Sequence, residues 1–120
     1  MNFNPLRWTL ILIVPAISSC YYDVEEELYS TVVCNTPVAV NFTTHVQPVI
    51  NSFCASSGCH VTGGTGVGNF ETYAGVKAKV DDGSFTERTL QAKNMPPSGN
   101  LSTCDLELLQ AWVDLGSPEN

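Results

Sequence analysis

The 120-residue chain is poor in charge, and above all in positive charge. Only 14% of its residues are charged, with 5 Lys and Arg against 12 Asp and Glu and a net charge of -7. A surface that binds nucleic acid neutralises phosphates with clustered basic residues, which this chain lacks. Its length also excludes a large enzyme, because a chain of this size buries one small core. We therefore expect a single small acidic module with no nucleic-acid partner.

The sequence has no hydrophobic run long enough to span a membrane, which takes roughly 20 residues. Its apolar stretch at residues 9–17 is shorter and contains Pro15. A basic residue, a short apolar stretch and small residues before a cut are typical of a secretory signal peptide, so residues 1–19 are predicted to be removed.

The tetrapeptide Ile17–Cys20 resembles a bacterial lipobox. This resemblance implies export and acylation of Cys20, which would anchor the protein to a membrane, facing the periplasm or the cell surface. A free or disulfide-bonded Cys20 is the alternative.

Residues 20–33 are predicted to be a lipidated acidic linker. Four acidic residues, Asp23 and Glu25–Glu27, follow Cys20 closely, and the stretch has no apolar periodicity that would bury a face. Acidic residues in this place resemble the surface-export signals of some Bacteroidetes lipoproteins, although short acidic linkers have other uses.

The 5 cysteines need more than one role, since pairing leaves one over. Once Cys20 is set aside, the segment CASSGCH at residues 54–60 is the most informative. It resembles a c-type haem attachment site, in which two thiols bond the porphyrin edge and the adjacent histidine ligates the iron. Four residues separate Cys54 from Cys59 instead of the usual two, but these residues are small and turn-forming, so the extra two can bulge outward.

Three other interpretations of this segment remain open. A zinc site would need Cys54, Cys59 and His60 to converge on one ion, without a second cysteine pair to complete it. A Cys54–Cys59 disulfide beside a Cys34–Cys104 disulfide would make a stapled, non-haem binding lipoprotein. A redox-active dithiol normally has cysteines two residues apart at the start of a helix, whereas a helix is expected to end at Cys54.

Only two methionines occur, and Met1 belongs to the signal peptide. Met95 lies in the turn-rich segment 93–99, where Pro96 and Pro97 restrict the backbone. A methionine that fills a core normally lies in a periodic apolar segment. Met95 is therefore the candidate for a sixth iron ligand, and it argues against a haem sensor or peroxidase with an open distal side.

The order of these parts resembles a small class I cytochrome c, and more closely the monohaem cytochrome c domains of Bacteroidetes lipoproteins. The shared segments are VQPVI at 46–50, the Cys-His site at 54–60, NMPP at 94–97 and LQAWVDLG at 109–116, all within residues 34–118. The resemblance implies a small all-α cytochrome c-like domain over 34–118, wrapped around one covalently bound haem c.

The same resemblance implies roles for single residues. His60 and Met95 would be the axial ligands, and Cys54 and Cys59 the attachment points. A disulfide between Cys34 and Cys104 is also implied, because the first and last helices pack together in class I cytochromes. The implied function is single-electron transfer between redox partner proteins, by a carrier that is not an enzyme.

Sequence patterns predict four helices. The first is capped by Thr43 or Thr44, which leaves His45 exposed at its start, and it ends at Cys54. Two short helices are expected over 70–80 and 85–93, after a glycine-rich loop at 61–69 that would wrap the haem's proximal side. The last helix begins at Ser102, with Asp105 as a capping-box partner, and stops at Gly116 and Pro118.

Overall fold

The computed structural model describes residues 32–99 and 101–120, and in these ranges the regular secondary structure is helical, with no strand. This confirms the all-α prediction for the described part of the chain. The elements are η1 (Phe42–Val46), α2 (Gln47–Phe53), α3 (Tyr73–Asp81), η2 (Thr86–Gln91) and α4 (Thr103–Asp114), where η marks a π-helical segment. The predicted signal peptide, Cys20 and the linker up to residue 31 lie outside the described residues.

The first helical segment, η1 followed by α2, begins earlier than predicted. Its cap is Asn41, whose side-chain oxygen accepts a hydrogen bond from the N–H of Thr44 over 2.9 Å. Asparagine is among the best capping residues, so Asn41 competes successfully with Thr43 and Thr44. His45 is half-buried, in contrast to the prediction, and its Nδ1 accepts from the N–H of Asn41 over 3.2 Å. The segment ends as predicted, with Cys54 as the C-terminal cap of α2.

The two middle helices flank the predicted turn. α3 starts at Tyr73, three residues later than expected, because the hydroxyl of Thr72 accepts from the N–H of Gly75 and caps the helix there. Phe70 precedes the helix as a buried loop residue. η2 follows the turn at Gly83 and contains the buried Thr89.

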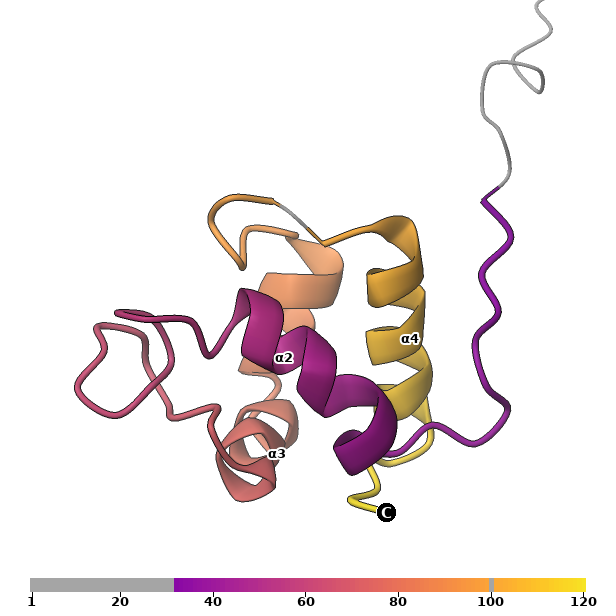
Figure 1. Ribbon diagram of the computed structural model, residues 1–120, viewed down its shortest axis with the longest axis horizontal. Helices are drawn as coiled ribbons and strands as arrows, with labels where there is room; N and C mark the ends of the chain where they lie inside the picture. Colours follow the sequence, from indigo (N-terminus) through magenta and orange to yellow (C-terminus); the bar gives the residue numbers. More distant parts are fainter. Residues whose placement is uncertain (1–31, 100) are drawn as a thin grey trace, which may run out of the picture. The chain divides into compact units, whose positions relative to one another are not determined.

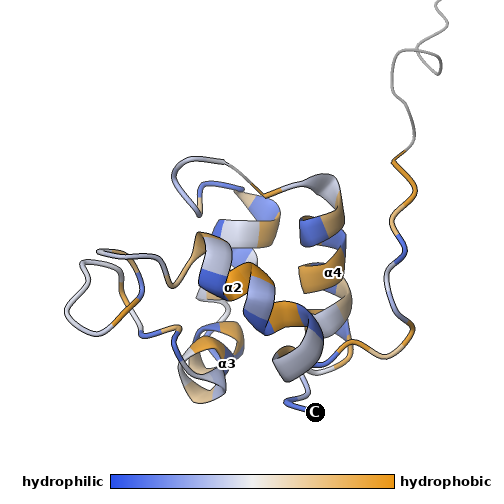
Figure 2. Cartoon of the chain, in the orientation of Figure 1, coloured by the Kyte–Doolittle hydropathy of each residue, from blue (hydrophilic) through white to orange (hydrophobic). Residues whose placement is uncertain are grey.

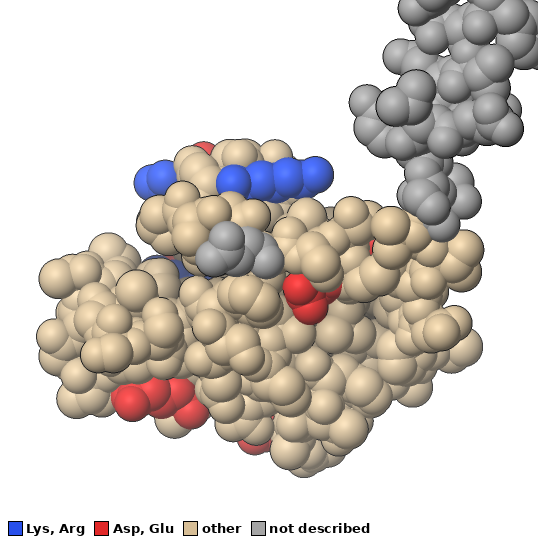
Figure 3. Space-filling model, turned by 45° about the horizontal axis from the view of Figure 1, so that its top comes forward, with Lys and Arg blue, Asp and Glu red and all other residues tan. Residues whose placement is uncertain are grey.

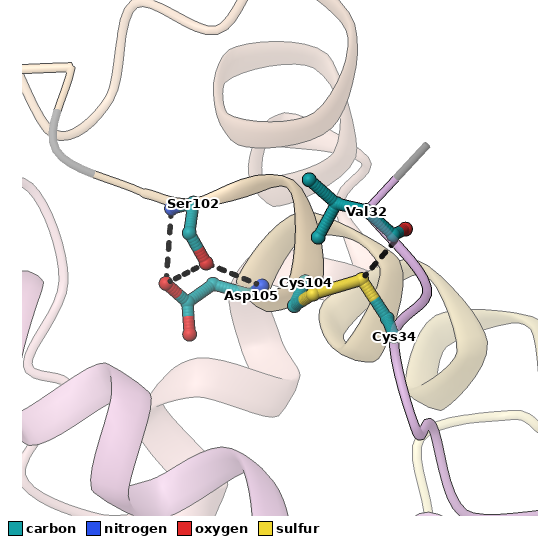
Figure 4. Close-up of a disulfide and its surroundings, with 5 residues drawn as sticks. All are labelled: Val32, Cys34, Ser102, Cys104 and Asp105. Atoms are coloured by element: carbon teal, nitrogen blue, oxygen red, sulfur yellow. Dashed lines mark hydrogen bonds between the residues drawn. A yellow bond between two sulfur atoms is a disulfide. The ribbon is translucent and has the colours of Figure 1, made fainter. Parts of the chain in front are cut away.

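The last helix, α4, begins with the predicted capping box. The hydroxyl of Ser102 accepts from the N–H of Asp105, and the carboxylate of Asp105 accepts from the N–H of Ser102 over 2.9 Å. Next to this box, Cys104 forms a disulfide with Cys34, with Cα atoms 5.3 Å apart (Figure 4). The disulfide ties the extended segment before η1 to the start of α4 (Figure 1).

The core is built by one buried face of each helical segment. The buried hydrophobic side chains are Val40, Phe42, Val46, Ile50, Cys54, Phe70, Val76, Phe85, Leu109 and Trp112. Hydrophobic residues accordingly lie on α2, α3 and α4 in Figure 2, and Figure 1 shows α2 in front, between α3 and α4. Within the described ranges, no helix is long and apolar enough to cross a membrane.

The C-terminal residues close this core. Pro118 accepts two hydrogen bonds through its carbonyl oxygen, from the indole of Trp112 over 2.9 Å and from the N–H of Phe42 over 3.0 Å. The hydroxyl of Tyr73 donates to the carbonyl oxygen of Ser117 over 2.9 Å. These bonds satisfy the indole N–H of the buried Trp112 and the hydroxyl of the partly buried Tyr73, which would otherwise cost free energy on burial.

Aromatic rings connect the core to the Cys-His segment. Trp112 meets Phe85 with ring centroids 6.4 Å apart, Phe85 meets Phe70 at 6.4 Å, and Phe70 meets His60 at 4.2 Å. His60 is thus connected, through Phe70 and Phe85, to the fully buried Trp112.

Candidate functional site

The segment 54–60 forms a closed turn at the end of α2. The N–H of His60 donates to the carbonyl oxygen of Cys54 over 3.2 Å, and the N–H of Cys59 donates to that of Ser56 over 3.0 Å. Gly58 lies inside the turn with a φ of 82°, which residues with a side chain adopt only at a cost. This closed turn contains the four residues that separate Cys54 from Cys59.

The ring of His60 has a fixed orientation. It stacks on Phe70 with an angle of 9° between the planes, and its Nδ1 lies 3.3 Å from the carbonyl oxygen of Gly68. Because a carbonyl oxygen can only accept, Nδ1 carries the proton in the neutral ring and Nε2 keeps a free lone pair. Histidines that bind metals are commonly oriented by a bond of this type.

The glycine-rich run 61–69 is a loop, as predicted, and it packs against the Cys-His turn. The N–H of Gly66 donates to the carbonyl oxygen of Cys59 over 3.2 Å, and that of Thr65 donates to Gly58 over 3.0 Å. A side-chain carbon at position 66 would lie 2.7 Å from Nδ1 of His60. A glycine is therefore needed there for the close approach of the loop to the ring.

Glu71 holds the two ends of this loop together through hydrogen bonds. Its carboxylate accepts hydrogen bonds from the N–H and hydroxyl of Thr62, over 3.0 and 2.7 Å, and from the amide of Asn69 over 2.8 Å. The bond from the Thr62 hydroxyl is the main reason that the pKa of Glu71 is lowered from its ordinary value. The loop thus has a defined shape next to His60.

Cys54 and Cys59 are free thiols, so the disulfide of the stapled alternative is not formed between them. Cys54 is buried at 7% exposure, and this burial, with a smaller effect of Cys59, raises the pKa of its thiol to about 11. Its place at the C-terminus of α2 also disfavours a thiolate. A redox-active dithiol requires a lowered thiol pKa, which this environment does not provide.

The zinc interpretation finds no support in the geometry. In residues 32–99 and 101–120, no three or more side chains of His, Cys, Asp or Glu are grouped so that they could hold a metal ion.

A cavity of about 640 Å³ opens beside the glycine-rich loop, and His60 and Met95 both line it. The structure therefore brings the two predicted axial ligands to the same space. The residues that line this cavity do not include Cys54 or Cys59. Apolar side chains of Val67, Phe70 and Phe85 contribute to its walls. Pockets of about 300–1,000 Å³ typically hold small molecules and cofactors.

The loop that carries Met95 is attached to η2. The carbonyl oxygen of Arg88 accepts hydrogen bonds from the N–H of Asn94 over 3.0 Å and from the N–H of Met95 over 3.2 Å. Pro96, next in the chain, is buried, while Met95 itself is partly exposed toward the cavity. Met95 is therefore positioned by backbone bonds and not by membership of a helix.

Charged and polar side chains form another part of the cavity wall: Lys79, Asp82, Ser84 and Arg88. Lys79 pairs with Asp82 over 2.6 Å, and the N–H of Ser84 donates to Asp82 over 2.9 Å. Bonds from Lys79 and Ser84 lower the pKa of Asp82 to about 2. On the face shown in Figure 3, positive side chains lie along the top of the molecule, apart from most of the acidic ones.

Sequence reasoning identified the candidate ligands but missed the residues around them. The prediction places Phe70 at the start of a helix and Gly66 in a loop that wraps the haem's proximal side, and it gives Arg88 no role. The spacing of a motif indicates which groups carry chemistry, whereas the contacts that orient them depend on how the loop folds back. For Arg88, the only available signal was its place in the seven residues before Met95 in a chain with few cations.

Comparisons with protein families, with curated proteins and with solved structures find no match to this chain. The class of protein that the site defines is thus a small helical module with a cavity between a histidine turn and a methionine loop.

Proposed function

We propose that the protein is a membrane-tethered monohaem c-type cytochrome that transfers single electrons between redox partner proteins. The observation that carries this proposal is that His60 and Met95, far apart in the sequence, line one cavity. A nitrogen donor and a thioether on the wall of one apolar space are the axial ligand set of electron-transferring haems.

The residues of the cavity fit a haem in three respects. His60 has its Nδ1 bonded to Gly68, which leaves Nε2 available to a metal. Phe70, Phe85 and Val67 offer apolar surface for a porphyrin. Met95 contributes a soft, neutral sulfur on a loop held by Arg88. When bound, the haem would supply the one-electron chemistry, and the protein would supply ligands, orientation and exclusion of water.

Cys54 and Cys59 are the proposed attachment points. Their turn is closed onto His60 by the bond from His60 N–H to Cys54, so a group ligated by His60 would lie next to this turn. Cys59 is partly exposed, whereas Cys54 is buried. Thioether formation at Cys54 therefore requires a local rearrangement at the end of α2. Ile50 is the one buried residue within α2, so few buried contacts oppose such a rearrangement.

The membrane tether and export belong to the same proposal, through acylation of Cys20. A second function, a disulfide-stapled non-haem binding lipoprotein, has one supporting observation, namely the Cys34–Cys104 disulfide. The second disulfide of that alternative, Cys54–Cys59, is not formed. In a non-haem binding lipoprotein, the cavity would hold an apolar ligand that needs no iron ligand from His60 or Met95.

The test is a haem stain on a denaturing gel, after export of the protein through a cytochrome c maturation system. Thioether bonds survive denaturation, so we expect the wild-type band to stain and the Cys54→Ala/Cys59→Ala band not to stain. The matched control is Cys34→Ala/Cys104→Ala, which also removes two cysteines but should keep the stain. An unstained wild-type band would overturn the proposal and favour the binding lipoprotein.

A further inference from the structure

The charges on the cavity wall do not balance. Three charged side chains line the cavity: Lys79, Asp82 and Arg88. Lys79 and Asp82 neutralise each other over 2.6 Å, and Asp82 receives a further bond from Ser84. No ion pair among the described residues includes Arg88. One guanidinium group is therefore left without a counter-charge on the wall.

Arg88 also has a defined place between the polar part of the wall and the Met95 loop. Ser84 and Arg88 are four residues apart in the helical segment that includes η2, so their side chains lie on the same face. Ser84 connects this face to Asp82 and Lys79. The carbonyl oxygen of Arg88 accepts from Met95. Its side chain is exposed, which places the guanidinium where the cavity meets solvent.

A haem has an apolar ring and two ionised propionate carboxylates. An arginine binds a carboxylate through two parallel hydrogen bonds and keeps its charge at any physiological pH. The protein has a net charge of -7, so its overall field repels an anionic cofactor. A cavity in such a protein needs a local positive charge to accept those carboxylates, and Arg88 is the unpaired one on the wall.

We infer that Arg88 is a positioning residue that binds a propionate carboxylate of the cofactor at the mouth of the cavity. This inference rests on the proposed function. The inference predicts an effect on the midpoint potential of the iron. Ferric haem carries one more positive charge than ferrous haem, so a nearby guanidinium that also neutralises a carboxylate destabilises the ferric form. Loss of the guanidinium should therefore stabilise the ferric form and lower the midpoint potential.

The experiment is a redox titration of the haem-loaded full chain, with Arg88→Gln, Arg88→Lys and Lys93→Gln compared with the wild type. Lys93 is the matched control, because it is exposed and in no ion pair of the described residues, but does not line the cavity. At the wild-type midpoint, we expect Arg88→Gln to lower the ratio of ferrous to ferric protein about tenfold, equivalent to about 59 mV for one electron. Arg88→Lys should restore most of the ratio, and Lys93→Gln should change it little.

The absorption spectrum separates this effect from damage to the Met95 loop. The backbone bond from Met95 to Arg88 does not need the arginine side chain, so the variants should stay low-spin and six-coordinate. Equal shifts for Arg88→Gln and Lys93→Gln, or no shift for Arg88→Gln, would overturn the inference and leave the haem proposal intact. A wild-type chain without haem would overturn both.

Discussion

The backbone of Gly66 lies against the imidazole of His60, so closely that a side-chain carbon at position 66 would be 2.7 Å from Nδ1 and 2.9 Å from Cε1. The same ring stacks on Phe70, with an angle of 9° between the planes. Gly66 does not have a positive φ, so its lack of a side chain serves this contact and not an unusual backbone conformation.

Gly66→Ala is therefore expected to push the His60 ring out of place. Overpacking of this kind typically costs about 1–3 kcal/mol, because the neighbours must shift. We expect the free energy of unfolding of the apoprotein to fall by that amount in denaturant titrations. In the haem-loaded protein, we expect a smaller fraction of low-spin, six-coordinate iron in the absorption spectrum.

The control for this variant is Thr65→Ser, which changes the neighbouring residue but keeps the hydroxyl that donates to Gly58 over 3.1 Å. It should leave both measurements as they are in the wild type. If Gly66→Ala also leaves them unchanged, the ring of His60 is not restrained by the loop.

The sequence predicted those parts of the site that depend on local chemistry. The capping box of Ser102 and Asp105 was correct, because two side chains three residues apart determine it. The end of α2 at Cys54 was also correct, because the apolar periodicity runs up to Phe53 and small, turn-forming residues follow Cys54. The start of the first helix was wrong by two or three residues, because Asn41 and the threonines after it are all good caps and tertiary contacts decide among them.

The surroundings of the candidate ligands could not be predicted in the same way. The stacking of His60 on Phe70 depends on a loop that returns to its own start, and glycine content indicates only that such a loop is permitted. Likewise, the unpaired state of Arg88 depends on the pairing of Lys79 with Asp82 across a turn. The spacing of Lys79 and Asp82 permits a pair, but it does not indicate that both residues and Arg88 line one cavity, because this depends on how the loops fold.

The proposed lipid anchor predicts the distribution of the protein between membrane and soluble fractions. Each buried methylene of an acyl chain contributes about 0.8 kcal/mol to membrane binding, so loss of the lipid should abolish it. We expect Cys20→Ala to leave the membrane pellet and Cys34→Ala, as the control, to stay in it, both followed by immunoblot after fractionation. Sedimentation of Cys20→Ala with membranes would show that a different part of the chain holds it there.

The Cys34–Cys104 disulfide should stabilise the fold mainly by restricting the unfolded chain. It joins residues with a sequence separation of 70, for which the chain-entropy estimate is about 4 kcal/mol. This is an upper value for the haem-loaded protein, whose unfolded chain is already restricted by thioether bonds. Cys34→Ala/Cys104→Ala should unfold at lower denaturant concentration and with a larger m-value, because its unfolded state exposes more surface.

A thiol count provides the check on this disulfide. Oxidised, denatured wild-type protein should show no reactive thiol at Cys34 or Cys104 by mass-mapped alkylation. Alkylation of both residues would mean that the disulfide is absent in the exported protein. The wild type and Cys34→Ala/Cys104→Ala should then have the same free energy of unfolding.

The role of Met95 can be tested by replacing its sulfur at constant volume. Met95→Leu keeps the size of the side chain, and such exchanges usually cost less than about 1.5 kcal/mol of stability. If Met95 ligates the iron, the leucine variant should become high-spin or water-ligated and should bind carbon monoxide readily. The wild type should bind carbon monoxide poorly, because carbon monoxide must first displace the Met95 sulfur. Every 1.4 kcal/mol of free energy in the iron–sulfur bond weakens the apparent affinity for carbon monoxide about tenfold.

Met95→His completes this test, because it keeps the iron six-coordinate and low-spin but replaces a soft, neutral sulfur with a nitrogen donor. A thioether favours ferrous iron, and axial ligands set haem potentials over a range of about 0.8 V. The midpoint potential of Met95→His should therefore be clearly below that of the wild type, while Met95→Leu should differ in spin state. If the wild type binds carbon monoxide freely and Met95→Leu changes neither spectrum nor potential, Met95 only packs the loop. The distal side would then be open, and a haem sensor or peroxidase would become the better interpretation.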